Sequence, residues 1–274
     1  MVRSVSIVGC GTIANEIARA IADGTVAVDL SAVYDHHTDR VAAVRDQFDS
    51  ENRPRYADSP SELFEADVVI EAAGQQAVEE IAVDALGEGC DCMLMSVGAL
   101  ADEDLRSEVI SAAESSDGKL LLPSGAIAGL DAIKAAALAG EVETVGLQTT
   151  KPPAGLEGAP YIEANGIDLD SVEERSVIFE GPASQAATAF PSNINVAMAL
   201  SLAGIGPEET AVEIIADPDV ESNVHRIVAE GGVGQIETTV KNVPSPTNPK
   251  TSYLAAMSAI KKLQGFNTDV DVGT

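Results

Sequence analysis

The stretch Val5-Ser6-Ile7-Val8-Gly9-Cys10-Gly11-Thr12-Ile13-Ala14 decides the fold of this chain. An apolar run of β-strand character leads into the pattern G-x-G-x-x-A, and helical apolar spacing follows it. This is the dinucleotide-binding fingerprint, with Ala in the place of the third glycine. Gly9 permits a tight turn, Gly11 lets a pyrophosphate approach the backbone, and a helix that starts at Thr12 and Ile13 supplies oriented N–H donors.

The next predicted strand, Leu30 to Tyr34, ends directly before Asp35. An acidic residue at this place accepts hydrogen bonds from the adenosine ribose 2'-hydroxyl and disfavours a 2'-phosphate, so Asp35 favours NAD. His36 and His37 follow, and their ring nitrogens can donate to a 2'-phosphate, which leaves NADP possible; the alternative is that both are exposed rim residues. Ala73, at the carboxyl end of a later strand, is predicted to lie beside the nicotinamide ribose.

Length and periodicity predict two domains. At about 150 residues per domain, 274 residues are enough for two. Apolar strand-like runs alternate with helical patterns up to residue 120, which predicts an α/β Rossmann domain with a doubly wound parallel sheet in residues 1–120. Short helices then mix with strands, which predicts a second α+β catalytic and dimerisation domain in residues 121–248. The strands predicted there are Glu143 to Thr150, Ser176 to Glu180, Ala211 to Ala216 and Gly234 to Lys241. A final helix at 249–264, capped by Asn248, would be free to pack back on the first domain.

Composition restricts the partners and the environment. The chain has 44 acidic and 16 basic residues, a formal net charge of −28, which repels nucleic acid and anionic membranes. No long apolar run and no signal-peptide pattern occurs, so we expect a cytoplasmic protein. The acids are spread along the chain, only 7 of the basic residues are Lys, and Trp is absent. This composition resembles that of cytoplasmic proteins from salt-accumulating halophiles; the alternative is an ordinary acidic protein.

The three cysteines do not indicate a disulfide framework or a metal site. Cys90 and Cys92 are too close together for the usual zinc spacing and lie in an apolar run, where small thiols commonly pack in the core. Neither they nor Cys10 suggest a secreted, disulfide-rich protein. We therefore expect no metal.

His225 is the leading candidate for acid–base chemistry. It is the one histidine outside the cofactor half, and an imidazole pKa near 6.5 suits proton transfer around neutrality. The alternative interpretation is a packed or surface histidine. Asp217 and Asp219 are candidates for orienting it. Lys151, in a Pro-flanked segment, is a scarce cation that suits a substrate carboxylate, although a surface lysine is the equally plain interpretation.

Taken together, the residues resemble the L-aspartate dehydrogenase family, whose members are amino-acid dehydrogenases with an N-terminal Rossmann domain. The matching segments run along nearly the whole chain. They are Val8 to Gly11, Glu71 to Val78, Met95 to Leu100, Pro123 to Ala132, Thr150 to Pro153, Asn193 to Ala197, Ala216 to Pro218, Asn223 to His225 and Asn242 to Ser252. The resemblance implies that His225 is the active-site residue and that Ala126 and Asn195 contact the cofactor.

The resemblance also implies a reaction. L-Aspartate would be oxidatively deaminated to iminoaspartate with NAD or NADP, and hydrolysis would give oxaloacetate and ammonia, with a role in NAD biosynthesis or in catabolism. We expect His225 to handle protons and Lys151, Lys250, Ser124 or Thr150 to hold the two carboxylates.

Three further expectations concern alternatives and assembly. A related two-domain dehydrogenase could act on another small substrate, although the Glu-Lys-Pro signature of sugar oxidoreductases is replaced by Ser96-Val97-Gly98-Ala99. A catalytically silent NAD-binding sensor is the other alternative. An open sheet in the second domain would suit a homodimer, the commonest oligomer.

Overall fold

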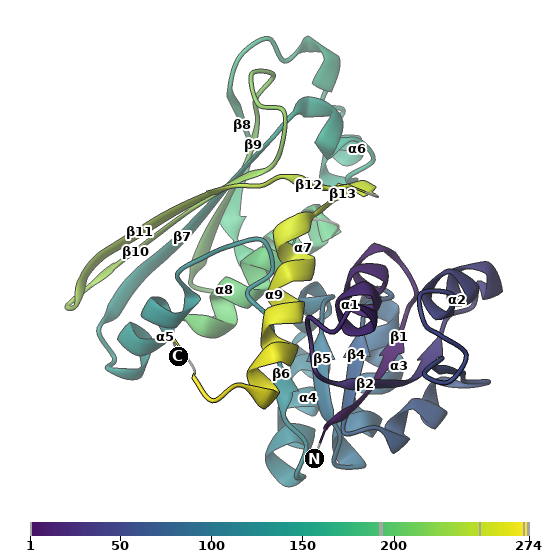
Figure 1. Ribbon diagram of the computed structural model, residues 1–274. Helices are drawn as coiled ribbons and strands as arrows, with labels where there is room; N and C mark the ends of the chain where they lie inside the picture. The colour runs from purple at the N-terminus through teal and green to yellow at the C-terminus, as the bar shows by residue number, and fades with distance from the viewer. Residues whose placement is uncertain (1, 192–193, 247, 271, 273–274) are drawn as a thin grey trace. The chain divides into compact units, whose positions relative to one another are not determined.

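The structure is a computed structural model that describes residues 2–191, 194–246, 248–270 and 272, with residues 249 and 250 described by their backbone alone. The chain divides into two compact units. Unit 1 comprises Met1–Pro123 and Ala255–Asp271, and unit 2 comprises Ser124–Leu254 and Val272–Thr274. Each unit is described separately below, with the labels of Figure 1.

Unit 1 is built on a parallel sheet in the order β3-β2-β1-β4-β5-β6. Its strands are β1 (Ser4–Val8), β2 (Asp29–Tyr34), β3 (Arg55–Tyr56), β4 (Val68–Glu71), β5 (Asp91–Leu94) and β6 (Leu120–Leu121). From β1 the chain first builds toward β3 and then returns to add β4 on the other side, so the strand order reverses between β1 and β4. Open α/β sheets bind their ligands at this switch point, and the predicted Rossmann fold is confirmed.

Helices connect the strands of unit 1. They are α1 (Thr12–Ala22), α2 (Thr38–Arg45), η1 (Pro60–Glu65), α3 (Gln75–Gly87), η2 (Val97–Ala101) and α4 (Glu103–Ser115). The central strands are buried on both faces of the sheet: Val5, Ile7, Val68 and Ile70 are fully buried on one face and Val69 on the other, so Val68 to Ile70 form an unbroken apolar run. Such continuous apolar runs are typical of parallel strands that are covered on both faces.

The last helix belongs to the core of unit 1. Helix α9 (Tyr253–Gln264) is followed by η6 (Gly265–Asn267), and it contributes Ala259, Ile260 and Leu263 to the apolar cluster of unit 1. The prediction that this helix starts at residue 249 is wrong, because Asn248–Ser252 form strand β13 instead. Strand β13 pairs with β12 (Pro244–Ser245) in a short hairpin, which engages the backbone groups that a first helical turn would need.

Unit 2 contains a mixed sheet in the order β11-β10-β7-β9-β8. The strands are β7 (Val142–Lys151), β8 (Ser176–Pro182), β9 (Thr210–Ala216), β10 (Val224–Gly231) and β11 (Gly234–Lys241). Strands β7 and β9 are parallel, and the other pairs are antiparallel. This confirms the predicted α+β class, although β10 was not among the predicted strands.

The helices of unit 2 lie mainly on one side of its sheet (Figure 1). They are α5 (Leu130–Leu138), η3 (Pro153–Leu156), α6 (Pro160–Asn165), η4 (Leu169–Ser171), α7 (Ala183–Ala189) and α8 (Asn195–Ala203). The strand residues under α7 and α8 are buried, among them Leu147, Val212 and Ile214. In the described part of the chain, none of the helices combines the length and the apolar character needed to cross a membrane.

Candidate active site

The glycine loop, residues 9–12, closes β1 and opens α1. Gly9 has φ +88°, and a Cβ atom there would lie 2.5 Å from the backbone N and Cα of Ala73, so only glycine fits. A Cβ on Gly11 would meet nothing within 4 Å, which leaves open space above the loop. Gly11 is the N-cap of α1, no side chain caps it, and the half-buried Thr12 and Ile13 begin the helix. These features fit the pyrophosphate of a dinucleotide: the turn has no room for side chains, the space above it is open, and the start of the helix has no side-chain cap.

Asp35 is built into this loop from the end of β2. Its carboxylate accepts hydrogen bonds from the backbone N–H of Cys10 at 2.7 Å and of His37 at 2.8 Å, and the residue is 8% exposed. Burial, and then the charge of Asp35, raise the pKa of Cys10 to about 12, so this thiol stays protonated. His36 and His37 are exposed, and His36 Nδ1 lies 3.2 Å from the hydroxyl of Tyr34. Asp35 therefore fixes the loop in addition to any contact with a ribose.

Asn15 supports the glycine loop from behind, and the sequence analysis missed it. Its Nδ2 donates to the carbonyls of Cys10 and Gly11 at 3.1 and 2.8 Å. Its Oδ1 accepts from Gln47 Nε2 at 2.8 Å. An Asn within a helix is not a sequence signal by itself. Its partner Gln47, in the loop that follows α2, comes close to Asn15 only in the folded chain.

Glu71 is a second missed residue. Ala73 is exposed beyond the end of β4, and its N–H donates to Glu71 Oε1 at 2.8 Å. Glu71 itself is fully buried. Burial raises its pKa, while hydrogen bonds from Gly74, Ser96 and Ala73 act in the opposite direction. The sequence did contain a signal for Glu71, because this glutamate directly follows three apolar strand residues. A glutamate is rarely buried at the end of a strand unless its carboxylate has hydrogen-bond partners.

His225 lies in the middle of the unit 2 sheet. Strand β10 pairs with β7 so that His225 stands opposite Thr149, and His225 Nδ1 is 3.0 Å from Thr149 Oγ1. His225 is 5% exposed and Thr149 is fully buried, near Ala186 of α7 and Ala197 of α8. The orienting partner is therefore Thr149 rather than Asp217 or Asp219. The Asp217 carboxylate instead accepts from the N–H of Asp219.

Lys151 completes this group, and we call Thr149, Lys151 and His225 the His225 cluster. Burial lowers the pKa of Lys151 to about 8. Burial, and then the positive charge of Lys151, lower the pKa of His225 to about 4. At neutral pH the cluster thus holds a neutral imidazole beside an ammonium that is still mainly charged. A neutral imidazole can accept a proton, and a neighbouring ammonium can hold an anionic group of a substrate.

The other predicted residues are more scattered. Thr150 follows Thr149 in β7, and the alternation of a strand turns it to the opposite face of the sheet from His225. Ser124 is half-buried and Ala126 is buried in the segment before α5, while Asn195 is exposed at the start of α8. Lys250 lies in β13, but its side chain is outside the described residues, as is Asn193.

Asn242 links two of these segments, although it was not among the predicted site residues. It is 4% exposed, and its Nδ2 donates to the carbonyl of Ala126 at 3.2 Å. Its backbone N–H donates to Asn223, directly before β10, at 2.9 Å, and its Oδ1 accepts from Ser252. Asn242 thereby ties the Ala126 segment to the start of the strand that carries His225.

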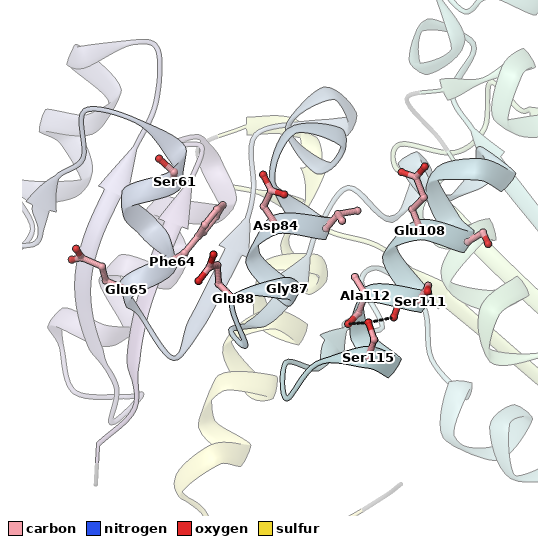
Figure 2. Close-up of a pocket in the computed structure, with 12 residues that line it drawn as sticks. Ser61, Phe64, Glu65, Asp84, Gly87, Glu88, Glu108, Ser111, Ala112 and Ser115 are labelled. Atoms are coloured by element: carbon pink, nitrogen blue, oxygen red, sulfur yellow. Dashed lines mark hydrogen bonds between the residues drawn. The ribbon is translucent and has the colours of Figure 1, made fainter.

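A wide groove of unit 1 lies elsewhere and has the wrong charge. It has a volume of about 1030 Å³ and is lined by η1 and by the C-terminal parts of α3 and α4 (Figure 2). Its charged lining residues are Glu65, Asp84, Glu88 and Glu108. These carboxylates repel an anionic substrate or a phosphate, so the groove does not suit either.

Comparisons with known proteins agree with this geometry. Residues 131–266 match the family model "Aspartate dehydrogenase, C-terminal", and residues 9–123 match "Homoserine dehydrogenase, NAD binding domain". The chain is 47% identical to an L-aspartate dehydrogenase of Methanosarcina acetivorans, over 98% of this chain and 99% of that one. It is 39% identical to an L-aspartate dehydrogenase of Nitrosopumilus maritimus, over 99% of this chain and 100% of that one.

The solved structures give the same result. The crystal structure of aspartate dehydrogenase from Thermotoga maritima matches with a TM-score of 0.77 at 25% identity, covering 100% of both chains. A homoserine dehydrogenase from Thiobacillus denitrificans shares the fold, with a TM-score of 0.62 at 12% identity, over 98% of this chain and 75% of that one. The chain therefore belongs to the L-aspartate dehydrogenase family.

Proposed function

We propose that this protein oxidatively deaminates L-aspartate to iminoaspartate with a pyridine nucleotide. The observation that carries the proposal is the His225 cluster, a buried neutral imidazole beside a half-buried ammonium on one face of a sheet. It supplies a base for the amino group and a cation for a carboxylate. Membership of the L-aspartate dehydrogenase family supports the same substrate.

Residues that the sequence analysis singled out would hold the cofactor. We assign Gly9, Gly11, Thr12 and Ile13 to the pyrophosphate, Asp35 to the adenosine ribose and Ala73 to the nicotinamide-side ribose. Ala126 and Asn195 stay predicted contacts. When bound, the nicotinamide supplies the hydride acceptor for the hydrogen on Cα of the substrate.

His225 acts on protons in this proposal. L-Aspartate arrives with an ammonium group, which has to lose a proton before hydride can leave Cα. Because Nδ1 is engaged with Thr149, Nε2 is the nitrogen for this transfer. Nε2 carries a lone pair only when Nδ1 carries the hydrogen and donates it to Thr149 Oγ1. After it has released that proton to solvent, the same nitrogen can accept a proton from the water that attacks the imine and pass it to the departing nitrogen, which gives oxaloacetate and ammonia.

Lys151 holds a substrate carboxylate. In a chain with a net charge of −28, a dianionic substrate needs a local cation, and Lys151 is close enough to His225 for its charge to lower the pKa of the imidazole. Ser124 and Lys250 stay candidates for the second carboxylate. Thr150 does not suit the task, because it faces the other side of the sheet from Lys151.

NAD is the favoured cofactor and NADP stays open. Asp35 is placed to accept from a ribose hydroxyl, and its negative charge opposes a 2'-phosphate. His36, His37 and Arg40 are exposed in the adjacent segment and can donate to such a phosphate. Steady-state KM values for the two cofactors would decide, with Asp35→Ala expected to reduce the preference for NAD.

A homodimer would use the side of the unit 2 sheet that faces away from α7 and α8. This side carries Gln148, Glu213, Arg226 and Glu237, joined by hydrogen bonds of 2.8 Å between Gln148 and Glu213 and between Arg226 and Glu237. A second copy could pair with this half-exposed polar surface across a two-fold axis. Light scattering would show the dimer, and Arg226→Glu, which adds repulsion from both neighbouring acids, would yield monomers.

We further propose that the enzyme works in a salt-rich cytoplasm and that its product serves NAD biosynthesis. Self-repulsion at −28 destabilises a compact chain in dilute buffer, and molar salt shortens the Debye length to about 3 Å. Iminoaspartate is the precursor that quinolinate formation would consume.

One absorbance assay tests the activity. NADH formation is followed with L-aspartate and NAD in low and in multimolar KCl, with D-aspartate, L-glutamate and NADP in parallel. We expect turnover with L-aspartate that rises with salt. Turnover of another substrate instead would point to a related dehydrogenase, and NAD binding without any turnover would point to a silent sensor.

A further inference from the structure

Of the acidic residues that the structure describes, Glu71 is the most completely buried, and like Asp35 it is held by N–H donors and not by a cation. Glu71 is fully buried, whereas most acidic residues are exposed. The buried Asp91 pairs with Arg3 and the buried Glu16 pairs with Arg19. Among the described residues, the partners of Glu71 are instead N–H and O–H donors of two loops.

These donors come from the ends of two neighbouring strands. Glu71 Oε1 accepts from the N–H of Ala73 at 2.8 Å, the N–H of Gly74 at 2.8 Å and the hydroxyl of Ser96 at 2.9 Å. Oε2 accepts from the N–H of Ser96 at 2.8 Å. One acceptor-only group thus holds the segment after β4 and the segment after β5 in a fixed relation.

The glycine loop is joined to the same assembly. Gly9 lies so close to Ala73 that no Cβ fits between them, and the N–H of Ala72 donates to the carbonyl of Val8 at 2.8 Å. The segments that follow β1, β4 and β5 are therefore packed and hydrogen-bonded to one another. All of them lie at the carboxyl edge of the parallel sheet, where dinucleotides bind in this class of fold.

We propose that Glu71 is a positioning residue for the pyridine nucleotide, acting through the backbone of Ala73, Gly74 and Ser96. Affinity for the cofactor then depends on this carboxylate. The chemistry of the His225 cluster, which belongs to unit 2, does not depend on it. The proposal rests on the proposed function, because it requires that the chain binds a pyridine nucleotide.

Glutamine cannot replace this carboxylate. If the amide oxygen of a Glu71→Gln variant takes the place of Oε1, the amide NH₂ faces the N–H of Ser96; in the flipped orientation it faces Ala73 and Gly74. A donor meets a donor in either orientation, so one loop is released. Glu80→Gln is the matched control. Glu80 is exposed on α3, and this substitution removes one negative charge from unit 1, as Glu71→Gln does.

Calorimetry with NAD or NADH and no aspartate is the first measurement. We expect Glu71→Gln to raise the dissociation constant on the order of tenfold or more, as for a lost hydrogen bond to a charged group, and Glu80→Gln to leave it unchanged. In steady state, KM for NAD should rise while KM for aspartate stays constant. In the cofactor-free state, hydrogen exchange of Glu71→Gln should be faster than that of the original protein either at Ser96 or at Ala73 and Gly74, and unchanged elsewhere in unit 1.

The outcomes separate the two proposals. If the unaltered protein binds no pyridine nucleotide, the proposed function fails. If it binds and Glu71→Gln binds equally well, only the role of Glu71 fails; a lower melting temperature with unchanged affinity would likewise assign Glu71 to stability alone. Should Glu71→Gln not fold, Ser96→Ala removes one hydrogen bond to the carboxylate and leaves it buried. That variant is expected to weaken binding severalfold, and unchanged binding would overturn the proposal.

Discussion

The glycine loop of unit 1 and the His225 cluster of unit 2 are made of different kinds of atoms. The loop offers backbone N–H groups and space, and its important residues, Gly9 and Gly11, contribute no side chain. The cluster offers side-chain atoms, and Thr149 and His225 are separated by 76 positions in the chain. One part of the site is local in sequence, and the other exists only through strand pairing.

This difference determines which kind of substitution damages each part. Adding atoms should harm the loop, because there is no room for them, whereas removing a functional group should harm the cluster. The predictions below test this contrast, and they should leave the other unit's function intact.

The largest effect is expected from His225→Asn. Losing the base should lower kcat by about 10²- to 10⁴-fold, the usual contribution of a positioned general base. The dissociation constant for NAD should be unchanged. In the control variant His36→Asn, neither kcat nor the dissociation constant for NAD should change. A His225→Asn enzyme that turns over normally but binds NAD poorly would break the contrast between the units.

The pH dependence of stability should carry the signature of the cluster. Burial and Lys151 lower the pKa of His225 from 6.5 to about 4 in the folded state, so protons bind more tightly to the unfolded chain. This stabilising contribution is present above about pH 6.5 and is lost as pH falls toward 4. It amounts to about 3 kcal/mol. Denaturant titrations at several pH values should show that the free energy of unfolding of the original protein falls more steeply with decreasing pH than that of His225→Asn. The same pH dependence in both proteins would contradict the prediction.

Gly9→Ala tests the other side of the contrast. The added methyl group has to displace the backbone of Ala73, so NAD affinity should fall about 10- to 100-fold. Gly24→Ala is the matched control, because Gly24 also has a positive φ, +79°, but faces open space. Both variants carry backbone strain, and only Gly9→Ala should lose NAD in calorimetry. Equal losses would show that strain rather than close packing matters.

The smallest effect is expected from Thr149→Val. This change keeps the shape and removes the hydrogen bond to His225 Nδ1, so kcat should fall about 5- to 10-fold and its pH profile should shift. Thr150→Val alters the next residue on the opposite face of β7 and should change neither. If Thr150→Val instead raises KM for aspartate, the original expectation that Thr150 holds a carboxylate regains support.

The same contrast explains how far sequence reasoning reached. Gly9, Gly11 and Asp35 were identified because turn, helix start and strand end follow one another along the chain. The pairing of Thr149 with His225 was out of reach, since antiparallel register depends on contacts between distant segments. Strand β10 was missed because Arg226 and Glu230 occupy outward positions and a histidine occupies an inward one, which obscures the apolar alternation. The final helix was predicted to start too early because Asn followed by Pro, at 248 and 249, is typical of a helix start. In the structure these residues belong to β13 of the hairpin.

The order of the units along the chain has a consequence for biosynthesis. The chain leaves unit 1 at Pro123 and returns to it at Ala255, so unit 2 is inserted into unit 1. A ribosome therefore releases Ser124–Leu254 of unit 2 before Ala259, Ile260 and Leu263 emerge to close the apolar core of unit 1. Until then, the newly made Rossmann sheet lacks part of its cover, and a chain stopped before α9 would expose apolar surface to the quality-control machinery.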